Sequence, residues 1–196
     1  MEMLDISRRD IARHLGYKRP EDLDDITAAR IEECVKEVTD VAEYQSIHHT
    51  FPIIWKEELC EFAGIKIHSK DLLKNLKGCS EAIMLAVTIG PAVDRLIRRA
   101  EVTDVSKAVI LQAVGAEVVE AWCNKVNLDI KNDMAAKGCS TKPRFSPGYG
   151  DLPLELQQEF ERVLQMRKNI GISLSDSNIM TPSKSITAVI GISYNN

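Results

Sequence analysis

The stretch from residue 104 to about residue 131 constrains the fold of this chain more than any other. Between residues 108 and 123 it is apolar on nearly every side. The polar groups in that interval belong to Gln112, Glu117 and Glu120. A helix that is apolar all round is buried. We therefore expect a long central helix, opened by Thr103 or Asp104, against which the other elements pack.

Glu120 has an unusual position on this predicted helix. At about 100° per residue, it shares one narrow stripe with Val109, Ala113, Ala116 and Cys123. A glutamate is almost never buried without a partner. Three interpretations follow: the stripe faces a solvent-filled cleft, Glu120 has a partner, or this part of the helix emerges into solvent.

A second feature is the segment RFSPGYGDLP, residues 144–153. Its two prolines lack a backbone donor and fix their own φ, while its two glycines can adopt positive φ without steric cost. We therefore expect an extended, sharply turned loop, although many Pro- and Gly-rich stretches are plain turns. Arg144, at the start of the loop, carries a planar fork that suits a carboxylate or a phosphate.

An arginine and a glutamate that face one cleft are complementary to an amino-acid zwitterion. Arg144 would take the carboxylate, and Glu120 would take the ammonium group. Together with the Pro-Gly loop and Tyr149, these two residues form the binding site that the sequence predicts.

The other elements follow from local patterns of apolar residues, caps and turn residues. Predicted helices cover about residues 8–15, 26–42, 70–77, 91–101 and 154–166. Predicted strands cover residues 44–55, 59–62, 65–68, 81–89, 172–174 and 186–192, with Pro52 near a strand end or on an edge. We expect residues 131–143 to form a polar connection.

Several classes of function lack their sequence signals. The net charge is −4 and no basic stripe is present, which argues against binding of nucleic acid. The five cysteines include no C-x-x-C pair and the four histidines lack metal spacing, so we expect neither a disulfide framework nor a metal site. No phosphate loop, nucleophile elbow or H-E-x-x-H motif occurs, which argues against a self-contained hydrolase.

Membrane signals are also missing from the sequence. The longest apolar run, residues 82–93, is interrupted by Thr, Gly and Pro and is shorter than the roughly 20 residues that span a bilayer. The N-terminal MEMLDISRRD is charged and lacks the apolar region of a signal peptide. We expect a cytoplasmic protein that does not associate with membranes.

The loop RFSPGYGDLP resembles the R-x-x-P-G-Y signature of the activation domain of cobalamin-dependent methionine synthase. Downstream, ELQQEFERVLQM, NIGISLSDSNIMTP and SKSITAVIGI resemble segments of that family in the same order. Upstream, GAEVVEAW resembles the helix that carries a ligand-binding glutamate, aligned here with Glu120, with Glu117 as the alternative. The match is specific from about residue 114 to residue 192. The N-terminal third is similar only in general pattern, to short stand-alone versions of this domain.

The resemblance implies an α+β fold: a twisted, mainly antiparallel sheet with packed helices and a ligand cleft at its edge. It implies one domain over residues 1–196, with a helical part over about 1–43 and a sheet-and-helix body over 44–196. The implied S-adenosylmethionine-binding residues are Glu120, Arg144, Ser146, Pro147, Gly148 and Tyr149. Arg144 would hold the methionyl carboxylate and Glu120 the amino group. The backbone of the next loop residues would line the ligand, and Tyr149 would face the ligand or the corrin.

The function implied by the resemblance is reactivation of a separate cobalamin-dependent methionine synthase. S-adenosylmethionine would methylate cobalamin after an external electron-donor protein reduces cob(II)alamin. The corrinoid would come on a partner protein, because the chain has no D-x-H-x-x-G motif, and no residue here is predicted to be catalytic. A C-terminal tyrosine and an N-terminal aspartate of the family have no convincing counterpart here, which predicts either weaker binding of S-adenosylmethionine or a different ligand.

Two alternatives belong to other classes of function. The first is a non-enzymatic docking module for a corrinoid protein that does not use S-adenosylmethionine. The second is a free-standing methyltransferase for a small substrate. The absence of a glycine-rich strand-to-helix motif argues against the second.

Overall fold

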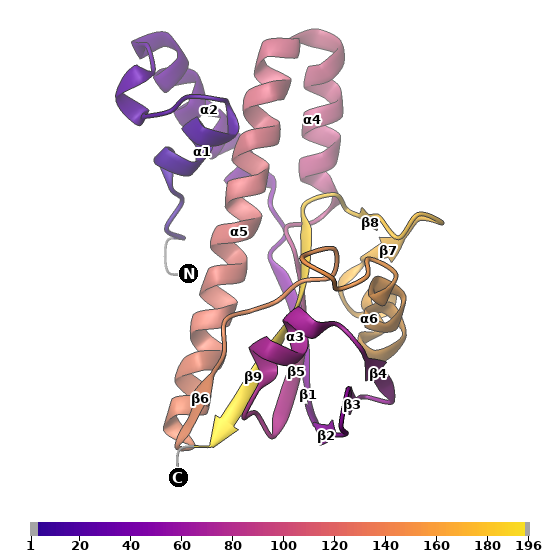
Figure 1. The fold of residues 1–196 in the computed structure, drawn as a ribbon. Helices are drawn as coiled ribbons and strands as arrows, with labels where there is room; N and C mark the ends of the chain where they lie inside the picture. Colours follow the sequence, from indigo (N-terminus) through magenta and orange to yellow (C-terminus); the bar gives the residue numbers. More distant parts are fainter. Residues whose placement is uncertain (1–3, 195–196) are drawn as a thin grey trace.

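The computed structural model of the protein describes residues 4–194. Its centre is a four-stranded antiparallel sheet in the order β1-β5-β9-β6 (Figure 1). The strands are β1 (Gln45–Pro52), β5 (Glu81–Thr88), β9 (Ser185–Tyr194) and β6 (Cys139–Thr141). As predicted, Pro52 ends an edge strand, where a missing backbone donor does little harm.

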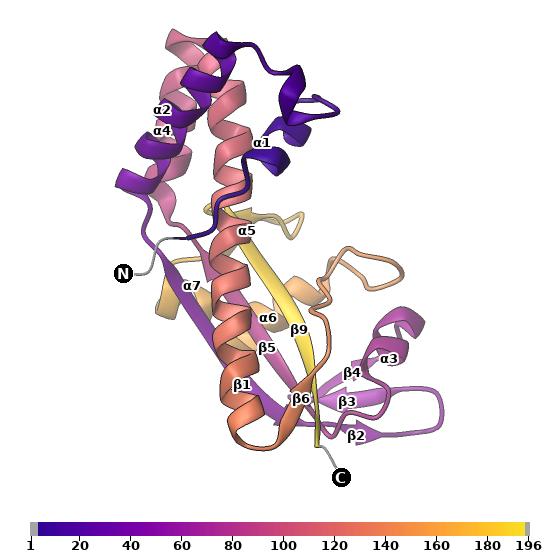
Figure 2. The same ribbon diagram turned by 90° about the vertical axis from the view of Figure 1, so that its left-hand side faces the viewer.

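The long apolar stretch forms helix α5 (Val105–Ala136), which the Asp104 side chain caps by accepting a hydrogen bond from the Lys107 N–H. This confirms the predicted central helix. One end of α5 packs against α1 (Arg8–His14), α2 (Asp25–Val41) and α4 (Pro91–Thr103). The rest of α5 runs along one face of the sheet (Figure 2). A short 3₁₀ helix, Pro20–Asp22, connects α1 to α2.

The opposite face of the sheet is covered by α3 (Lys70–Leu76), α6 (Leu156–Leu164) and α7 (Met166–Ile170). A small antiparallel sheet, β2 (Ile54–Trp55), β3 (Cys60–Phe62) and β4 (Ile65–Ile67), lies beside them. A two-stranded ribbon, β7 (Ser173–Leu174) and β8 (Met180–Thr181), leads into β9. The architecture is the α+β fold with a mainly antiparallel sheet that the sequence analysis expects.

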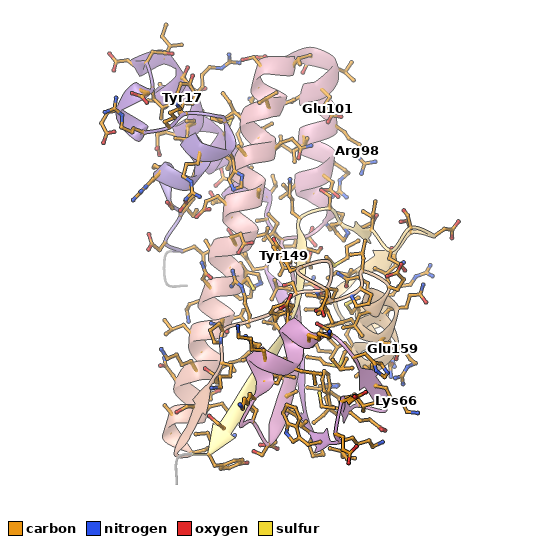
Figure 3. All side chains as sticks on the ribbon, viewed as in Figure 1. Tyr17, Lys66, Arg98, Glu101, Tyr149 and Glu159 are labelled. Carbon is orange, nitrogen blue, oxygen red and sulfur yellow. The ribbon has the colours of Figure 1, made fainter. Side chains whose placement is uncertain are left out.

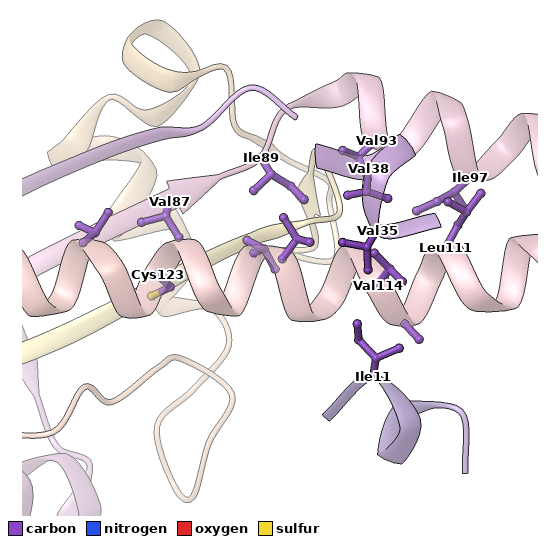
Figure 4. Close-up of a cluster of buried hydrophobic side chains, with 14 of the residues drawn as sticks. Ile11, Val35, Val38, Val87, Ile89, Val93, Ile97, Leu111, Val114 and Cys123 are labelled. Carbon is purple, nitrogen blue, oxygen red and sulfur yellow. The ribbon is translucent and has the colours of Figure 1, made fainter. Parts of the chain in front are cut away.

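Two hydrophobic clusters fill the two sides of this sheet because side chains alternate along a strand. In β5, Ile83, Leu85 and Val87 face the α5 side, where they join residues of α2 and α4 (Figure 4). Ala82, Met84 and Ala86 face the other side, toward α3, α6 and α7. The central strands are therefore buried on both faces, which explains their nearly continuous apolar sequence.

Three predicted boundaries are wrong. The expected polar connection over residues 131–143 instead contains the end of α5 and the short strand β6. The single helix expected over residues 154–166 is divided, because Gln165 adopts a left-handed conformation with φ of 47° and separates α6 from α7. The strand expected over residues 44–55 is also divided, into β1 and β2.

Candidate functional site

A cleft of about 400 Å³ opens where the loop of residues 144–153 leaves the edge of β9. Its walls come from α5, the loop, α6, β8 and the start of β9. The lining residues are Glu120, Arg144, Phe145, Ser146, Pro147, Tyr149, Gln157, Met180, Ser185, Ile186 and Thr187. Five of the six site residues proposed from the sequence therefore line one cavity, and Gly148 shapes the loop beside it. The volume lies within the range of small-molecule sites.

Arg144 and Glu120 meet directly at one end of the cleft. Arg144 Nη2 lies 2.5 Å from Glu120 Oε2, and Arg144 Nη1 donates to Asn124 Oδ1 at 2.7 Å. The side chain of Arg144 is 25% exposed and that of Glu120 is 44% exposed. Two of the three interpretations of Glu120 are thus combined, since it faces a cleft and has a partner.

This arrangement leaves both charged groups accessible to a ligand. A guanidinium has five N–H donors and a carboxylate has about four acceptor sites, so one mutual contact does not saturate either group. A carboxylate could bind Arg144, and an ammonium group could bind Glu120, without the pair separating. The complementarity to a zwitterion that the sequence suggests is therefore feasible in the fold.

The loop is a sequence of tight turns, as its glycines and prolines predict. Gly148 and Gly150 have φ of 89° and 55°, a region that favours glycine. The Tyr149 N–H donates to the Ser146 carbonyl, and the Gly148 N–H donates to the Leu152 carbonyl. Tyr149 is largely exposed on the loop (Figure 3). The loop thus presents an aromatic ring to solvent on a turned backbone.

Asp151 fixes the far end of the loop to α3. Its carboxylate accepts hydrogen bonds from the Ser69 hydroxyl and from the backbone N–H groups of Lys70 and Asp71, the latter two at 2.7 and 3.2 Å. These are the unsatisfied donors at the start of a helix, which favour an anionic cap. The hydrogen bond from Ser69, followed by those from the backbone, holds the pKa of Asp151 below its ordinary value.

We expect Asp151→Ala to lower the thermal unfolding midpoint at neutral pH. The start of α3 keeps its Ser69 cap but loses the carboxylate that accepts from Lys70 and Asp71, and the loop loses its anchor. A carboxyl with a depressed folded-state pKa stabilises fully above its unfolded pKa, about 3.9 for aspartate, and this contribution is lost as pH falls through the folded value. The difference between wild type and variant should therefore shrink below pH ~4. Calorimetric melting across pH checks this, with Asp176→Ala in an exposed turn as the control. A difference that persists unchanged to the lowest pH would contradict it.

A second cavity of about 590 Å³ adjoins the cleft and shares Glu120 and Ile186 with it. Glu117, the alternative to Glu120 in the sequence alignment, lines this second cavity and is only 7% exposed. Its Oε1 accepts a hydrogen bond from the Ser7 N–H at 3.1 Å. Burial raises the pKa of Glu117 above the ordinary value. The geometry therefore separates the two glutamates, and only Glu120 contacts Arg144.

Sequence reasoning does not identify several residues in and beside the cleft. Asn124, which lines the adjoining second cavity, is one turn along α5 from Glu120 and supports Arg144; this spacing is a usable signal. Gln157 and Thr187 are buried and hydrogen-bonded to each other. Nothing in the local sequence distinguishes Gln157 from the other polar residues of its helix.

Two further features concern metal ions and membranes. Within residues 4–194, no group of three or more His, Cys, Asp or Glu side chains is placed to hold a metal ion. His48 and His49 are successive residues of β1, and desolvation lowers the pKa of His48. Over the same residues, no helix has the length and apolar character needed to cross a bilayer.

Comparison with known proteins agrees with this architecture. Residues 37–195 match the family model described as vitamin B12 dependent methionine synthase, activation domain. The chain therefore belongs to that family. Among solved structures, the crystal structure of the MetH reactivation domain bound to AdoHcy is similar, with a TM-score of 0.70 and 14% sequence identity. That match covers 95% of this chain and 73% of the other. At this identity the likeness establishes the fold. A search among curated proteins finds no match.

Proposed function

We propose that this chain binds S-adenosylmethionine and supports reactivation of a separate cobalamin-dependent methionine synthase. The observation that carries the proposal is the Arg144–Glu120 pair at the end of the cleft. Family membership supports the same role, and the structurally similar MetH domain was crystallised with AdoHcy, the demethylated form of this ligand. We also propose that residues 1–196 act as one domain, with a helical part over about residues 1–43.

In this proposal the protein holds and orients the methyl donor. Arg144 binds the methionyl carboxylate, Glu120 binds the amino group, and the backbone of Ser146, Pro147 and Gly148 lines the ligand. The exposed Tyr149 faces the ligand or the corrin of the partner. The chemistry occurs at the docked interface. The partner's cobalamin would supply the methyl acceptor there once an external donor protein has given it one electron, and the cleft would release S-adenosylhomocysteine after transfer.

Calorimetric titration of the wild-type chain with S-adenosylmethionine tests the proposal, and two glutamate variants locate the ammonium site. We expect Glu120→Gln to weaken binding roughly tenfold, because one charge-assisted hydrogen bond contributes about 1.5–3 kcal/mol. Glu117→Gln, on the same helix but in the second cavity, should leave the affinity within about twofold. No heat of binding by the wild-type chain would overturn the proposal. The reverse ranking of the variants would move the ammonium site to Glu117.

A docking module that does not use S-adenosylmethionine is the second candidate. The observation in its favour is that Arg144 and Glu120 already neutralise each other without a ligand. It predicts that a corrinoid protein is captured equally well with and without S-adenosylmethionine, and also by Arg144→Ala. The favoured function predicts that S-adenosylmethionine strengthens capture of the cob(I)alamin or cob(II)alamin form of the partner.

A further inference from the structure

The edge of β9 is paired only along part of its length. From the C-terminal end, β6 pairs with β9 as far as Thr141 opposite Ile192, and the Lys142 N–H then donates to the Gly191 carbonyl. After a one-residue offset, Phe145 and Val189 exchange two backbone hydrogen bonds of 2.9 and 2.8 Å. The ladder therefore runs from the end of α5 to the mouth of the cleft.

Pro147 explains why the ladder stops there. If the register of the Phe145–Val189 bridge continued for two more residues along each strand, Pro147 would lie opposite Thr187. A proline has no backbone N–H and cannot donate to the Thr187 carbonyl. The chain turns away through Gly148 instead, and the cleft occupies the space where a continued strand would lie.

The unpaired edge leaves the backbone N–H and carbonyl of Thr187, a residue that is 2% exposed, without a strand partner beside the cleft. In an antiparallel strand the backbone groups of alternate residues point to the same side. Those of Gly191 and Val189 point toward β6 and the loop, so those of Thr187 also point away from β5. No loop residue within the described part of the chain hydrogen-bonds to the Thr187 N–H or carbonyl.

Gln157 lies beneath this edge and adds a third polar group. It is only 3% exposed, and its Oε1 accepts a hydrogen bond from Thr187 Oγ1 at 2.9 Å. Because the carbonyl end of the amide is held by Thr187, the NH₂ end is free to point elsewhere. Nε2 has no hydrogen-bond partner among residues 4–194, although the side chain lines the cleft. This nitrogen is not among the side-chain atoms that are closed off from solvent without a partner in this part of the chain, so it can donate to a group that enters the cleft.

We propose that the Thr187 peptide edge and the Gln157 amide recognise the adenine ring of the ligand. The inference rests on the proposed function, in which Arg144 and Glu120 hold the amino-acid end. Adenine presents an amino donor beside a ring-nitrogen acceptor. The Thr187 carbonyl accepts from the amino group, and Gln157 Nε2 donates to the neighbouring ring nitrogen. Apolar side chains of the cleft, including Pro147 and Met180, cover the faces of the ring.

The positions of the two polar groups fit a ligand with two different ends. Glu120 reaches the cleft from α5, on one side of the sheet, whereas Gln157 reaches it from α6, on the other side. The edge of β9 lies between them. S-adenosylmethionine has an amino-acid end and a nucleoside end joined through its sulfonium, so it can contact both sets across this edge.

Base selectivity tests the inference directly. Calorimetry should compare S-adenosylhomocysteine with S-inosylhomocysteine, in which an oxygen replaces the amino group and the adjacent ring nitrogen becomes a donor. We expect the wild-type chain to prefer the adenosyl ligand by roughly tenfold or more, since the inosyl edge leaves buried polar groups unpaired. Gln157→Glu replaces the amide donor with an acceptor, so the ratio of adenosyl to inosyl affinity of this variant should fall toward one. Gln158→Glu, its exposed neighbour on α6, should keep the wild-type ratio.

Thr187 serves as a positioning residue in this scheme, so its variants provide a second readout. Thr187→Val removes the hydroxyl that orients the Gln157 amide and should lower the selectivity ratio, while Thr187→Ser should restore it. Circular dichroism establishes that each variant is folded. If Gln157→Glu does not fold, the wild-type ratio and the two Thr187 variants decide.

The outcomes separate this inference from the proposed function. The wild-type chain could bind the adenosyl ligand in an Arg144-dependent way and yet bind the inosyl ligand equally well. That result overturns adenine recognition and leaves the proposed function standing. Wild-type selectivity that Gln157→Glu and Thr187→Val leave unchanged also overturns it. Absence of binding to either ligand overturns both proposals.

Discussion

Replacing Arg144 with alanine is expected to lower the affinity for S-adenosylmethionine by about 100-fold or more. Arg144 is the only cationic side chain among the described residues that line the cleft. Its side chain is three-quarters buried, and its guanidinium is positioned by Glu120 and Asn124. Two charge-assisted hydrogen bonds to a carboxylate together contribute about 3 kcal/mol or more, and each 1.4 kcal/mol corresponds to about tenfold in affinity. Calorimetric titration measures the change.

The variant should fold normally, because the Arg144 side chain lies outside both hydrophobic clusters. Arg144→Lys should bind with intermediate affinity, since an ammonium keeps the charge but loses the planar two-donor geometry. Arg162→Ala removes an exposed arginine of α6 that pairs with Glu159, and it should bind like wild type. If Arg144→Ala kept the wild-type affinity, Arg144 would not bind the methionyl carboxylate, and the proposed position of the amino-acid end of the ligand would be wrong.

The elements that could be predicted are those whose signal lies within their own sequence. Helix α5 is apolar over many residues and β5 is a nearly continuous apolar strand, so burial alone indicates both. Strand β9 is indicated by its alternating, mainly apolar sequence. Strand β6 was missed because three residues are too few to show an alternating pattern. The break between α6 and α7 depends on the left-handed conformation of Gln165. The sequence there has no glycine, asparagine or proline that would predict a turn.

The residues of the site also differ in whether their own sequence context predicts them. Arg144 and Glu120 were identified because a charged residue in an apolar or glycine-rich context is costly and therefore informative. Gln157 gave no such signal, since a polar residue on an amphipathic helix is expected to face solvent. The open edge at Thr187 depends on the register between the loop and β9. That register is set by tertiary pairing, and the role of Pro147 in ending it becomes visible only when Phe145 is found opposite Val189.

Replacing Phe160 with alanine is expected to give the largest loss of stability. Phe160 is fully buried in the cluster that joins α6 to the sheet. Phe→Ala substitutions in cores typically cost about 3–5 kcal/mol through lost transfer free energy and the cavity left behind. Domains have total stabilities of only about 5–15 kcal/mol, so the variant should be only marginally stable. Urea unfolding followed by circular dichroism measures the free energy of unfolding.

Two further variants test whether the loss of stability comes from the cavity left at Phe160 or whether the fold is destabilised by any substitution of an apolar residue. Phe160→Leu keeps much of the apolar volume and should cost clearly less than alanine. Leu128→Ala, at a half-exposed position on α5, should change stability by no more than about 0.5 kcal/mol. Because Phe160 and Gln157 lie one turn apart on α6 and are both buried, loosening this helix should also reduce the adenosyl-to-inosyl selectivity. A loss below about 1 kcal/mol for Phe160→Ala, with an unchanged denaturant slope, would mean that α6 does not pack as described.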